Sequence, residues 1–139
     1  MAYGNRLPYT IEGAPAMRRI YIKEEVCIGC RLCEVYCQLK QSRAKNLVKA
    51  FKKESPRPLA RLRLEKRGAV SFSVRCQHCD DSPCVHVCLT GALSRDPETG
   101  LVNVDREKCI GCWTCVLACP LGAIRRDIEW GKIAKCDAC

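Results

Sequence analysis

The sequence predicts a small α+β protein in which related modules pair with pseudo-two-fold symmetry. Three observations favour this fold class. The chain has 14 cysteines among 139 residues and only 6% aromatic residues, so its modest apolar core needs a second source of stability. A cysteine-rich phrase occurs twice, as "VCIGCRLCEVYC" and "KCIGCWTCVLAC", and internal duplication of this kind is typical of paired modules. Short runs that alternate apolar and polar residues, as strands do, separate the cysteine groups.

The cysteines fall into four groups along the chain. They are Cys27, Cys30, Cys33 and Cys37; then Cys76, Cys79, Cys84 and Cys88; then Cys109, Cys112, Cys115 and Cys119; and finally the pair Cys136 and Cys139. The first and third groups read C-x2-C-x2-C-x3-C, the bacterial ferredoxin spacing in which three cysteines hold one [4Fe–4S] cluster and the fourth holds its neighbour. The second group has the same form with a longer middle gap. Structural zinc sites usually separate two C-x2-C knuckles by a dozen or more residues, so the spacing favours iron–sulfur clusters over zinc.

Disulfides are the third use of so many cysteines, and they need an oxidising compartment. Arg18 and Arg19 are followed by "IYIKEEVC", which is too charged for the apolar part of a secretion signal. No apolar run has the length of a transmembrane helix. The sequence therefore predicts a cytoplasmic protein whose thiols bind metal.

The predicted elements follow in chain order. Residues 1–17 form an extension, either flexible or bound to a partner. Residues 18–40 supply the first half of an outer cluster module, with a strand at "RIYIK". Residues 41–75 form a basic insertion, in which the helical spacing of Leu47, Val48 and Phe51 predicts a helix. In the same insertion, "LARLRL" and "AVSFSV" alternate on either side of "EKRG" and predict a β-hairpin.

Residues 76–135 are predicted to form an inner two-cluster module. The phrases "CLTGALSRD" and "CPLGAIRRD" repeat the same pattern after the second and third cysteine groups, and "ALSRDPETGLVNVD" predicts a hairpin that turns at Pro97 and Gly100. Residues 136–139, within "KCDAC", are interpreted as the first half of a fourth cysteine motif. Either the true chain continues for a few dozen residues more, or the protein has lost the tail.

These motifs resemble a known family. From Arg18 to Cys139 the chain is similar to the four-cluster, ferredoxin-like electron-transfer subunits that accompany dimethyl sulfoxide reductase, formate dehydrogenase, formate hydrogenlyase and carbon monoxide dehydrogenase. The phrases "CIGCRLCEVYC", "KAFKKESPRPLARLRLE", "CQHCDDSPCVHVCLTGALSRDPETG" and "CIGCWTC" look most like the subunit associated with carbon monoxide dehydrogenase. Related subunits of tungsten aldehyde oxidoreductases look similar. The resemblance implies tandem ferredoxin-like modules stabilised by clusters, with a helix and β-hairpin insertion.

The resemblance also implies how the cysteines are shared among clusters. One inner cluster would be held by Cys76, Cys79, Cys84 and Cys119. The other would be held by Cys109, Cys112, Cys115 and Cys88. Two outer clusters would each have three ligands here, namely Cys27, Cys30 and Cys33 for one, and Cys37, Cys136 and Cys139 for the other. Cys136 or Cys139 could instead complete the first outer set, so three or four [4Fe–4S] clusters are expected, two of them with complete ligand sets.

The implied function is that of an electron-transfer subunit without chemistry of its own. It would relay single electrons between a large catalytic subunit, with carbon monoxide dehydrogenase favoured, and an acceptor such as a hydrogenase, a ferredoxin or a flavoprotein. The iron–sulfur subunit of a tungsten or molybdenum aldehyde oxidoreductase, or of a related oxidoreductase, is an alternative. The residues themselves contain no phosphate-binding loop, dinucleotide fingerprint or Ser-His-Asp set that would indicate an enzyme.

A function of another class, a cluster- or zinc-bearing nucleic-acid-binding module, is suggested by the charge. The net charge is +9, and the stretch from Lys40 to Arg67 has 11 Lys and Arg against Glu54 and Glu65. However, each oxidised cluster with four thiolates carries about two negative charges. A basic shell that balances anionic clusters is therefore favoured over nucleic-acid binding.

Three further residues are singled out beside the cysteines. His78 either tunes the potential of a cluster or fills the loop surface. His86 is expected to be a packed or solvated helix residue. Trp113 either shields a cluster from water or belongs to the core or an interface.

Overall fold

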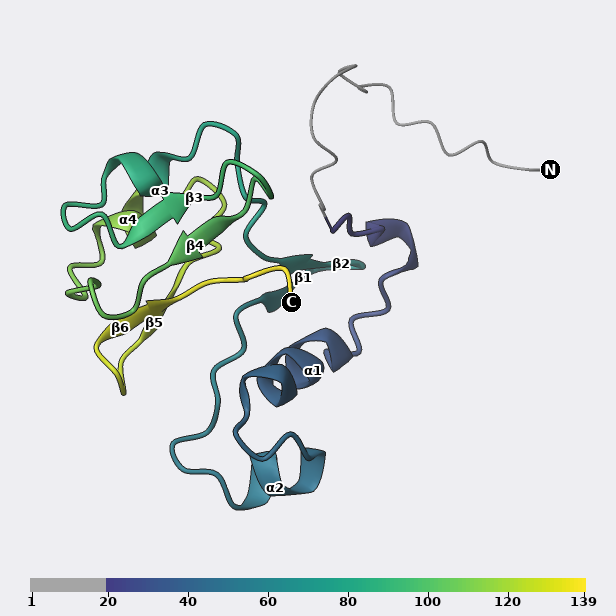
Figure 1. Cartoon of the computed structure of the whole chain (residues 1–139). Coiled ribbons are helices and arrows are strands. Elements are labelled where there is room, and N and C mark those ends of the chain that lie inside the picture. Colours follow the sequence, from purple (N-terminus) through teal and green to yellow (C-terminus); the bar gives the residue numbers. More distant parts are fainter. Residues whose placement is uncertain (1–19) are drawn as a thin grey trace.

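The computed structural model describes residues 20–139, and these form a mixed α+β structure (Figure 1). The predicted α+β class is confirmed, whereas the predicted extension at residues 1–17 lies outside the described residues. The helices are a 3₁₀-helix η1 (Glu24–Val26), α1 (Leu32–Gln41), α2 (Leu47–Lys52), α3 (Pro83–His86) and α4 (Thr114–Ala118). The strands form three separate antiparallel hairpins, namely β1 (Arg63–Arg67) with β2 (Val70–Val74), β3 (Leu93–Arg95) with β4 (Val102–Val104), and β5 (Arg125–Asp127) with β6 (Lys132–Ala134).

The prediction of a strand at "RIYIK" is wrong for residues 20–23, the part of this segment that the structure describes. Residues 20–23 form no strand and lead into η1. Ile20 and Tyr21 are exposed, and within residues 20–139 no other strand pairs with this segment. Alternation alone does not make a strand, because the backbone also needs a hydrogen-bonded neighbour.

The basic insertion contains the predicted helix and hairpin. Helix α2 begins after Asn46, whose side chain accepts a hydrogen bond from the Lys49 N–H at 3.1 Å, a typical N-cap. The hairpin turn is shorter than predicted, because β1 extends through Arg67, which pairs with Val70. Gly68 takes φ +61° in the two-residue turn that remains, a conformation that favours glycine and matches the twist of the paired strands.

The core is small and consists mainly of alanines and cysteines. Within residues 20–139, the buried apolar residues include only five larger aliphatic side chains, namely Leu64, Leu93, Val102, Ile124 and Ile133. Four of these five pack with Cys84, Cys109 and Cys115 in one cluster, while Cys76, Cys136 and Ala123 form a second. Each large side chain contributes about 1.5–3 kcal/mol when fully buried. Five are too few to offset the conformational entropy of a chain this long.

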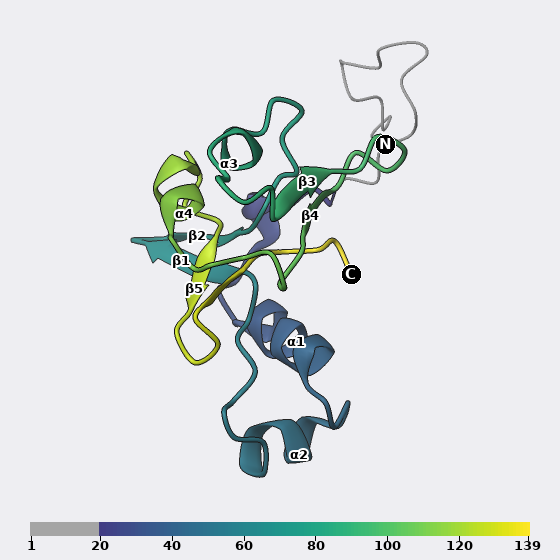
Figure 2. The same ribbon diagram turned by 60° about the vertical axis from the view of Figure 1, so that its left-hand side comes forward.

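The arrangement of the elements divides the described chain into two parts. Helices α3 and α4 lie together with the hairpins β3–β4 and β5–β6, while α1 and α2 extend away from them (Figures 1 and 2). The segment after β6 runs back toward the part that carries α1 and β1 (Figure 1). There Arg61 forms an ion pair with Asp137 at 2.6 Å. This return brings the last cysteine pair to the first cysteine group.

Replacing Gly111 by alanine is expected to destabilise the protein strongly. Gly111 has φ +70°, and a Cβ placed on it would lie 2.2 Å from the backbone oxygen of Gly131, so the β5–β6 turn must move. Gly131 is the matched control, because it also has positive φ (+59°) but a Cβ on it meets nothing within 4 Å. Both variants incur about 1–2 kcal/mol of left-handed strain. The Gly111→Ala variant should lose about 1–3 kcal/mol more through the clash, measured by anaerobic thermal unfolding. Equal losses in the two variants would show that this contact is not tight.

Candidate metal centres

All four cysteine groups use the same backbone turn at their C-x2-C segment. The residue before the second cysteine has positive φ in each case, namely +72° at Gly29, +50° at His78, +70° at Gly111 and +61° at Ala138. In at least two of these turns, the N–H of this residue donates to the sulfur of the first cysteine. The distances are 3.4 Å both from His78 N to Cys76 Sγ and from Ala138 N to Cys136 Sγ. The terminal "CDAC" therefore folds like the other cysteine loops.

Cys84, in helix α3, lies beside three other cysteines. Burial raises the pKa of its thiol, and the nearby charges of Cys76, Cys119 and Cys79 raise it further. Cys119 belongs to the third sequence group, and it follows α4 directly. The close contact between α3 and α4 brings it to the second group. The structure thus gathers the four cysteines that the resemblance implies for one inner cluster, and their role as its ligands stays a prediction.

Cys115, in helix α4, also lies beside three other cysteines, as Cys84 does. Burial raises the pKa of its thiol to about 11, together with the charges of Cys109, Cys112 and Cys88. These four cysteines line one small cavity, with Trp113 and Ile133 in its wall. Cys88 comes from the second sequence group. Although burial raises its pKa, the N–H groups of Leu93, Thr90 and Ala92 and the Thr90 hydroxyl lower it overall.

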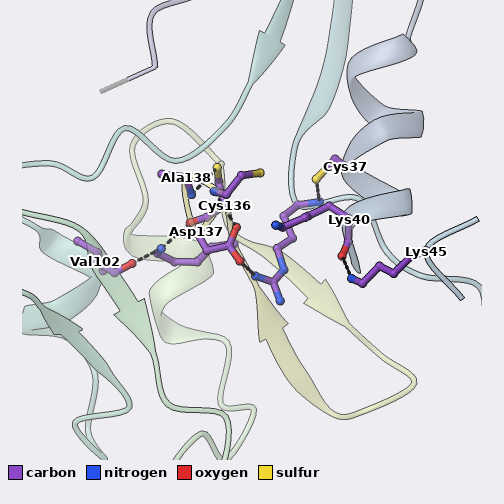
Figure 3. Close-up of polar contacts among 10 residues, drawn as sticks. Cys37, Lys40, Lys45, Val102, Cys136, Asp137 and Ala138 are labelled. Atoms are coloured by element: carbon purple, nitrogen blue, oxygen red, sulfur yellow. Dashed lines mark hydrogen bonds and ion pairs between the residues drawn. The ribbon is translucent and has the colours of Figure 1, made fainter. Parts of the chain in front are cut away.

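Cys37, in helix α1, lies near enough to the last cysteine pair for its thiol to feel their charges, and Figure 3 shows Cys37 and Cys136 in the same region. Burial raises the pKa of the Cys37 thiol, and the charges of Cys136 and Cys139 add to the rise. The Arg61 N–H donates to Cys37 Sγ at 3.1 Å. Arg61 also holds Asp137 through their ion pair, so one residue fixes both halves of this predicted outer set.

Cys27, at the start of the other predicted outer set, is held by the β1–β2 hairpin. The Ser71 hydroxyl lies 3.3 Å from Cys27 Sγ and 2.9 Å from the Cys27 carbonyl oxygen. The Ser71 hydrogen bond lowers the pKa of the Cys27 thiol, with help from the Gly29 N–H. Cys30 is exposed and Cys33 is partly buried.

Two hydrogen-bond donors to sulfur were missed by the reasoning from sequence. Ser71 lies 44 residues from Cys27, and no local signal connects the two. Thr114 donates to Cys112 Sγ at 3.5 Å and lowers the pKa of that thiol. A hydroxyl two residues after a cysteine is a local pattern that could have indicated this contact.

The three singled-out residues have distinct surroundings. His78 is buried, not on the loop surface, and its Nδ1 accepts a hydrogen bond from the Val102 N–H at 2.9 Å. It therefore anchors the second cysteine loop to β4. His86 is exposed and lies 2.8 Å from Asp81 Oδ1, as expected of a solvated residue. Trp113 is partly buried against the core, and it precedes α4 with φ +63°.

The cysteine sets suit an iron–sulfur cluster better than a single ion. Within residues 20–139, no three His, Cys, Asp or Glu side chains converge closely enough to hold one metal ion. The thiols instead gather in two groups of four, each with two buried members. Ligation by four thiolates is the donor set of a [4Fe–4S] cluster.

Comparison with known proteins agrees with this chemistry. The family model described as a 4Fe-4S dicluster domain matches residues 68–139. The chain belongs to this iron–sulfur family. The family assignment made from the cysteine spacing is thereby confirmed.

Three relatives illustrate where members of this dicluster family occur. The electron transport protein HydN of Escherichia coli (strain K12) is 42% identical over 98 residues, 70% of this chain and 53% of that protein. The thiosulfate reductase electron transfer subunit PhsB of Salmonella typhi is 37% identical over 126 residues, 84% of this chain and 59% of that protein. The aliphatic sulfonate oxidoreductase polyferredoxin-like subunit of Pyrococcus furiosus is 39% identical over 121 residues, 86% of this chain and 64% of that protein. The chain thus spans between about half and two thirds of these relatives.

The helices of residues 20–139 are too short or too polar to cross a lipid bilayer.

Proposed function

We propose that this chain is an electron-transfer subunit that relays single electrons between a catalytic redox subunit and a downstream acceptor. The observation that carries the proposal is the exchange of cysteines between loops. Cys119 lies with the second sequence group, and Cys88 lies with the third. This exchange supports an inner module, residues 76–135, that holds two [4Fe–4S] clusters side by side with pseudo-two-fold symmetry. A [4Fe–4S] cluster takes up and returns one electron without binding substrate.

The residues around the thiols would set the reduction potentials of the bound clusters. Burial of Cys76, Cys84, Cys109 and Cys115 limits the access of water to two thiols of each inner set. N–H and hydroxyl donors to sulfur, such as Thr114 at Cys112, stabilise negative charge on the ligands. These are the usual means by which a protein sets a cluster potential.

Cys136 provides the connection between the inner and outer sets. Its charge raises the pKa of Cys76 in an inner set and of Cys37 in an outer set. Cys136 therefore joins one inner set to the outer set of Cys37. This contact supports stepwise electron transfer between inner and outer sets. Among residues 20–139 the exposed thiols are Cys30, Cys112 and Cys139, and we place the two ends of the transfer path at Cys112 and Cys30.

Exposed aliphatic side chains surround these two ends. Ile110, two residues before Cys112, is 65% exposed, and Leu117 in the following helix α4 is 88% exposed. Ile28, between Cys27 and Cys30, is 86% exposed. Apolar side chains beside a redox centre are suited to a partner that excludes water on docking. We place the electron donor and the acceptor at these two ends.

Carbon monoxide dehydrogenase is the catalytic partner that the sequence likeness favours, and a tungsten or molybdenum oxidoreductase is the alternative. The exposed basic residues of the insertion, among them Lys45, Lys49 and Lys52, would assist docking to an acidic patch on either enzyme. Anaerobic affinity purification from the native cell, with mass spectrometry, tests the partner. We expect a large redox subunit. Co-purification of nucleic acid instead, lost at high salt, would contradict the proposal.

The iron content of the anaerobically purified chain is expected to be at least about 12 per protein. About eight irons would correspond to the inner pair alone, about 12 to three clusters and about 16 to four. Iron and acid-labile sulfide analysis measures the number of irons per protein. Thiolate-bound clusters should also absorb at about 400 nm. Zinc with negligible iron would overturn the proposed function. About eight irons would overturn only the outer clusters.

A further inference from the structure

Two buried cationic side chains lie beside the inner thiols, and the proposed function does not yet use them. Lys135 is 3% exposed and Arg75 is 5% exposed. Lys135 Nζ donates to the carbonyl oxygens of Val102 and of Cys136, the latter at 2.7 Å (Figure 3). Arg75 Nη1 donates to the Cys76 carbonyl oxygen at 3.0 Å. Each cation therefore adjoins one cysteine of the buried Cys76–Cys136 cluster.

The burial of these charges requires a compensating negative charge. An isolated ion is very costly to bury, so buried charges in proteins are normally paired. Within residues 20–139, Arg75 Nε and Nη2 are buried and have no hydrogen-bond partner. Burial lowers the pKa of Lys135, and the charges that oppose this are Cys76, Cys136, Cys84 and Asp137. Asp137 is itself paired with Arg61 and is partly exposed. Cys76 and Cys136 pack against each other, and their carbonyl oxygens accept from Arg75 and Lys135, so a bound anionic cluster there would supply the counter-charge.

The cationic side chains near the second inner set are less buried than Lys135 and Arg75. Lys132 donates to the Cys109 carbonyl oxygen but is only partly buried. Lys108 is exposed and lies 3.6 Å from Asp105. Solvent screens an exposed charge, whereas a charge in the low-dielectric interior acts strongly on its neighbours. The two inner sets therefore differ in the buried positive charge beside them.

We propose that Lys135, assisted by Arg75, raises the reduction potential of the cluster held by Cys76, Cys79, Cys84 and Cys119 above that of the other inner cluster. This inference rests on the ligand sets of the proposed function. Reduction adds one electron, and hence one negative charge, from the catalytic subunit, and no bond forms or breaks. A buried cation stabilises that added charge. The electron accordingly resides longer on this cluster, which is the one adjoining Cys136 and the outer set.

The test is an anaerobic potentiometric titration of the full chain, reduced with dithionite and followed by electron paramagnetic resonance. The Lys135→Met variant should lower the reduction equilibrium constant of one inner cluster about tenfold, which is about 59 mV for one electron. The Lys135→Arg variant, which keeps the charge, should shift it much less. The matched control is Lys108→Met, which removes an exposed lysine next to Cys109 and should leave both potentials nearly unchanged. The signal is assigned to its cluster by its loss in Cys119→Ala.

Three results would overturn the inference while leaving the proposed function intact. They are an unchanged potential in Lys135→Met, an equal shift of both inner clusters, and a Lys108→Met shift as large as that of Lys135→Met. Iron analysis of each variant verifies that the clusters are present. If Lys135→Met binds less iron, Arg75→Met is titrated in its place, and it must lower the same potential for the inference to stand. Wild-type protein without cluster signals would instead overturn the proposed function.

Discussion

Removal of iron is expected to abolish the cooperative unfolding of this protein. In the part of the chain that the structure describes, the buried apolar core contains only five side chains larger than alanine or cysteine. Without iron, burial of the Cys84 and Cys115 thiols, together with the charges of neighbouring cysteines, disfavours their ionised form, as their raised pKa values indicate. Binding free energy in a small metal-stabilised domain is largely folding free energy. Anaerobic circular dichroism should show a sharp thermal transition for the loaded protein and a broad, low-amplitude one after chelation.

Reconstitution with iron and sulfide is the control for this experiment, and it should restore the sharp transition. Zinc added in place of iron should not. A chelated chain that keeps a cooperative transition, together with protected amides in β3 to β6, would mean that packing and hairpins suffice for the fold.

Pairs of alanine substitutions are expected to reveal which cysteines share a cluster. The exchange of Cys119 and Cys88 between the inner sets predicts that Cys84→Ala and Cys119→Ala remove the same cluster. The double variant should therefore lose about four irons, no more than either single variant. The Cys84→Ala/Cys88→Ala double variant combines two neighbours in sequence, and it should lose about eight.

The opposite result would identify clusters built from single sequence groups. In that case Cys84→Ala/Cys88→Ala would lose about four irons, and Cys84→Ala/Cys119→Ala would lose about eight. The two double variants differ by only one substitution. Iron and sulfide analysis, with electron paramagnetic resonance of the remaining cluster, therefore separates the two arrangements directly.

The local structure was largely predictable because its causes are local. The spacing of Leu47, Val48 and Phe51 gave the position of α2, and alternation with turn residues gave the hairpins β1–β2 and β3–β4. The error at residues 20–23 has the same origin. A strand depends on a neighbour, and alternation within one segment contains no information about that neighbour. The turn at Gly68 was placed too early because "EKRG" suits either a longer turn or the end of a strand.

The features of the candidate sites also divide into local ones, which the sequence predicted, and long-range ones, which it did not. The identity of the thiols and their grouping into C-x2-C turns followed from spacing alone, and the turns at Gly29 and Gly111 share one backbone conformation. The buried position of His78 against Val102 did not follow. Nor did the hydrogen bond from Ser71 to Cys27, since each joins residues that are distant in sequence.

The sequence by itself determined the chemistry of this protein, because cysteine spacing within about a dozen residues limits which metal group the thiolates can hold. Only the tertiary structure decided which charges lie beside those thiolates. Lys135 and Arg75 are two of many basic residues in the chain, and nothing local marks them as buried. Lys135 is buried because the segment after β6 returns past Val102 to Cys76 and Cys37. Long-range packing of this kind sets the local dielectric, and hence the strength of every charge near a cluster.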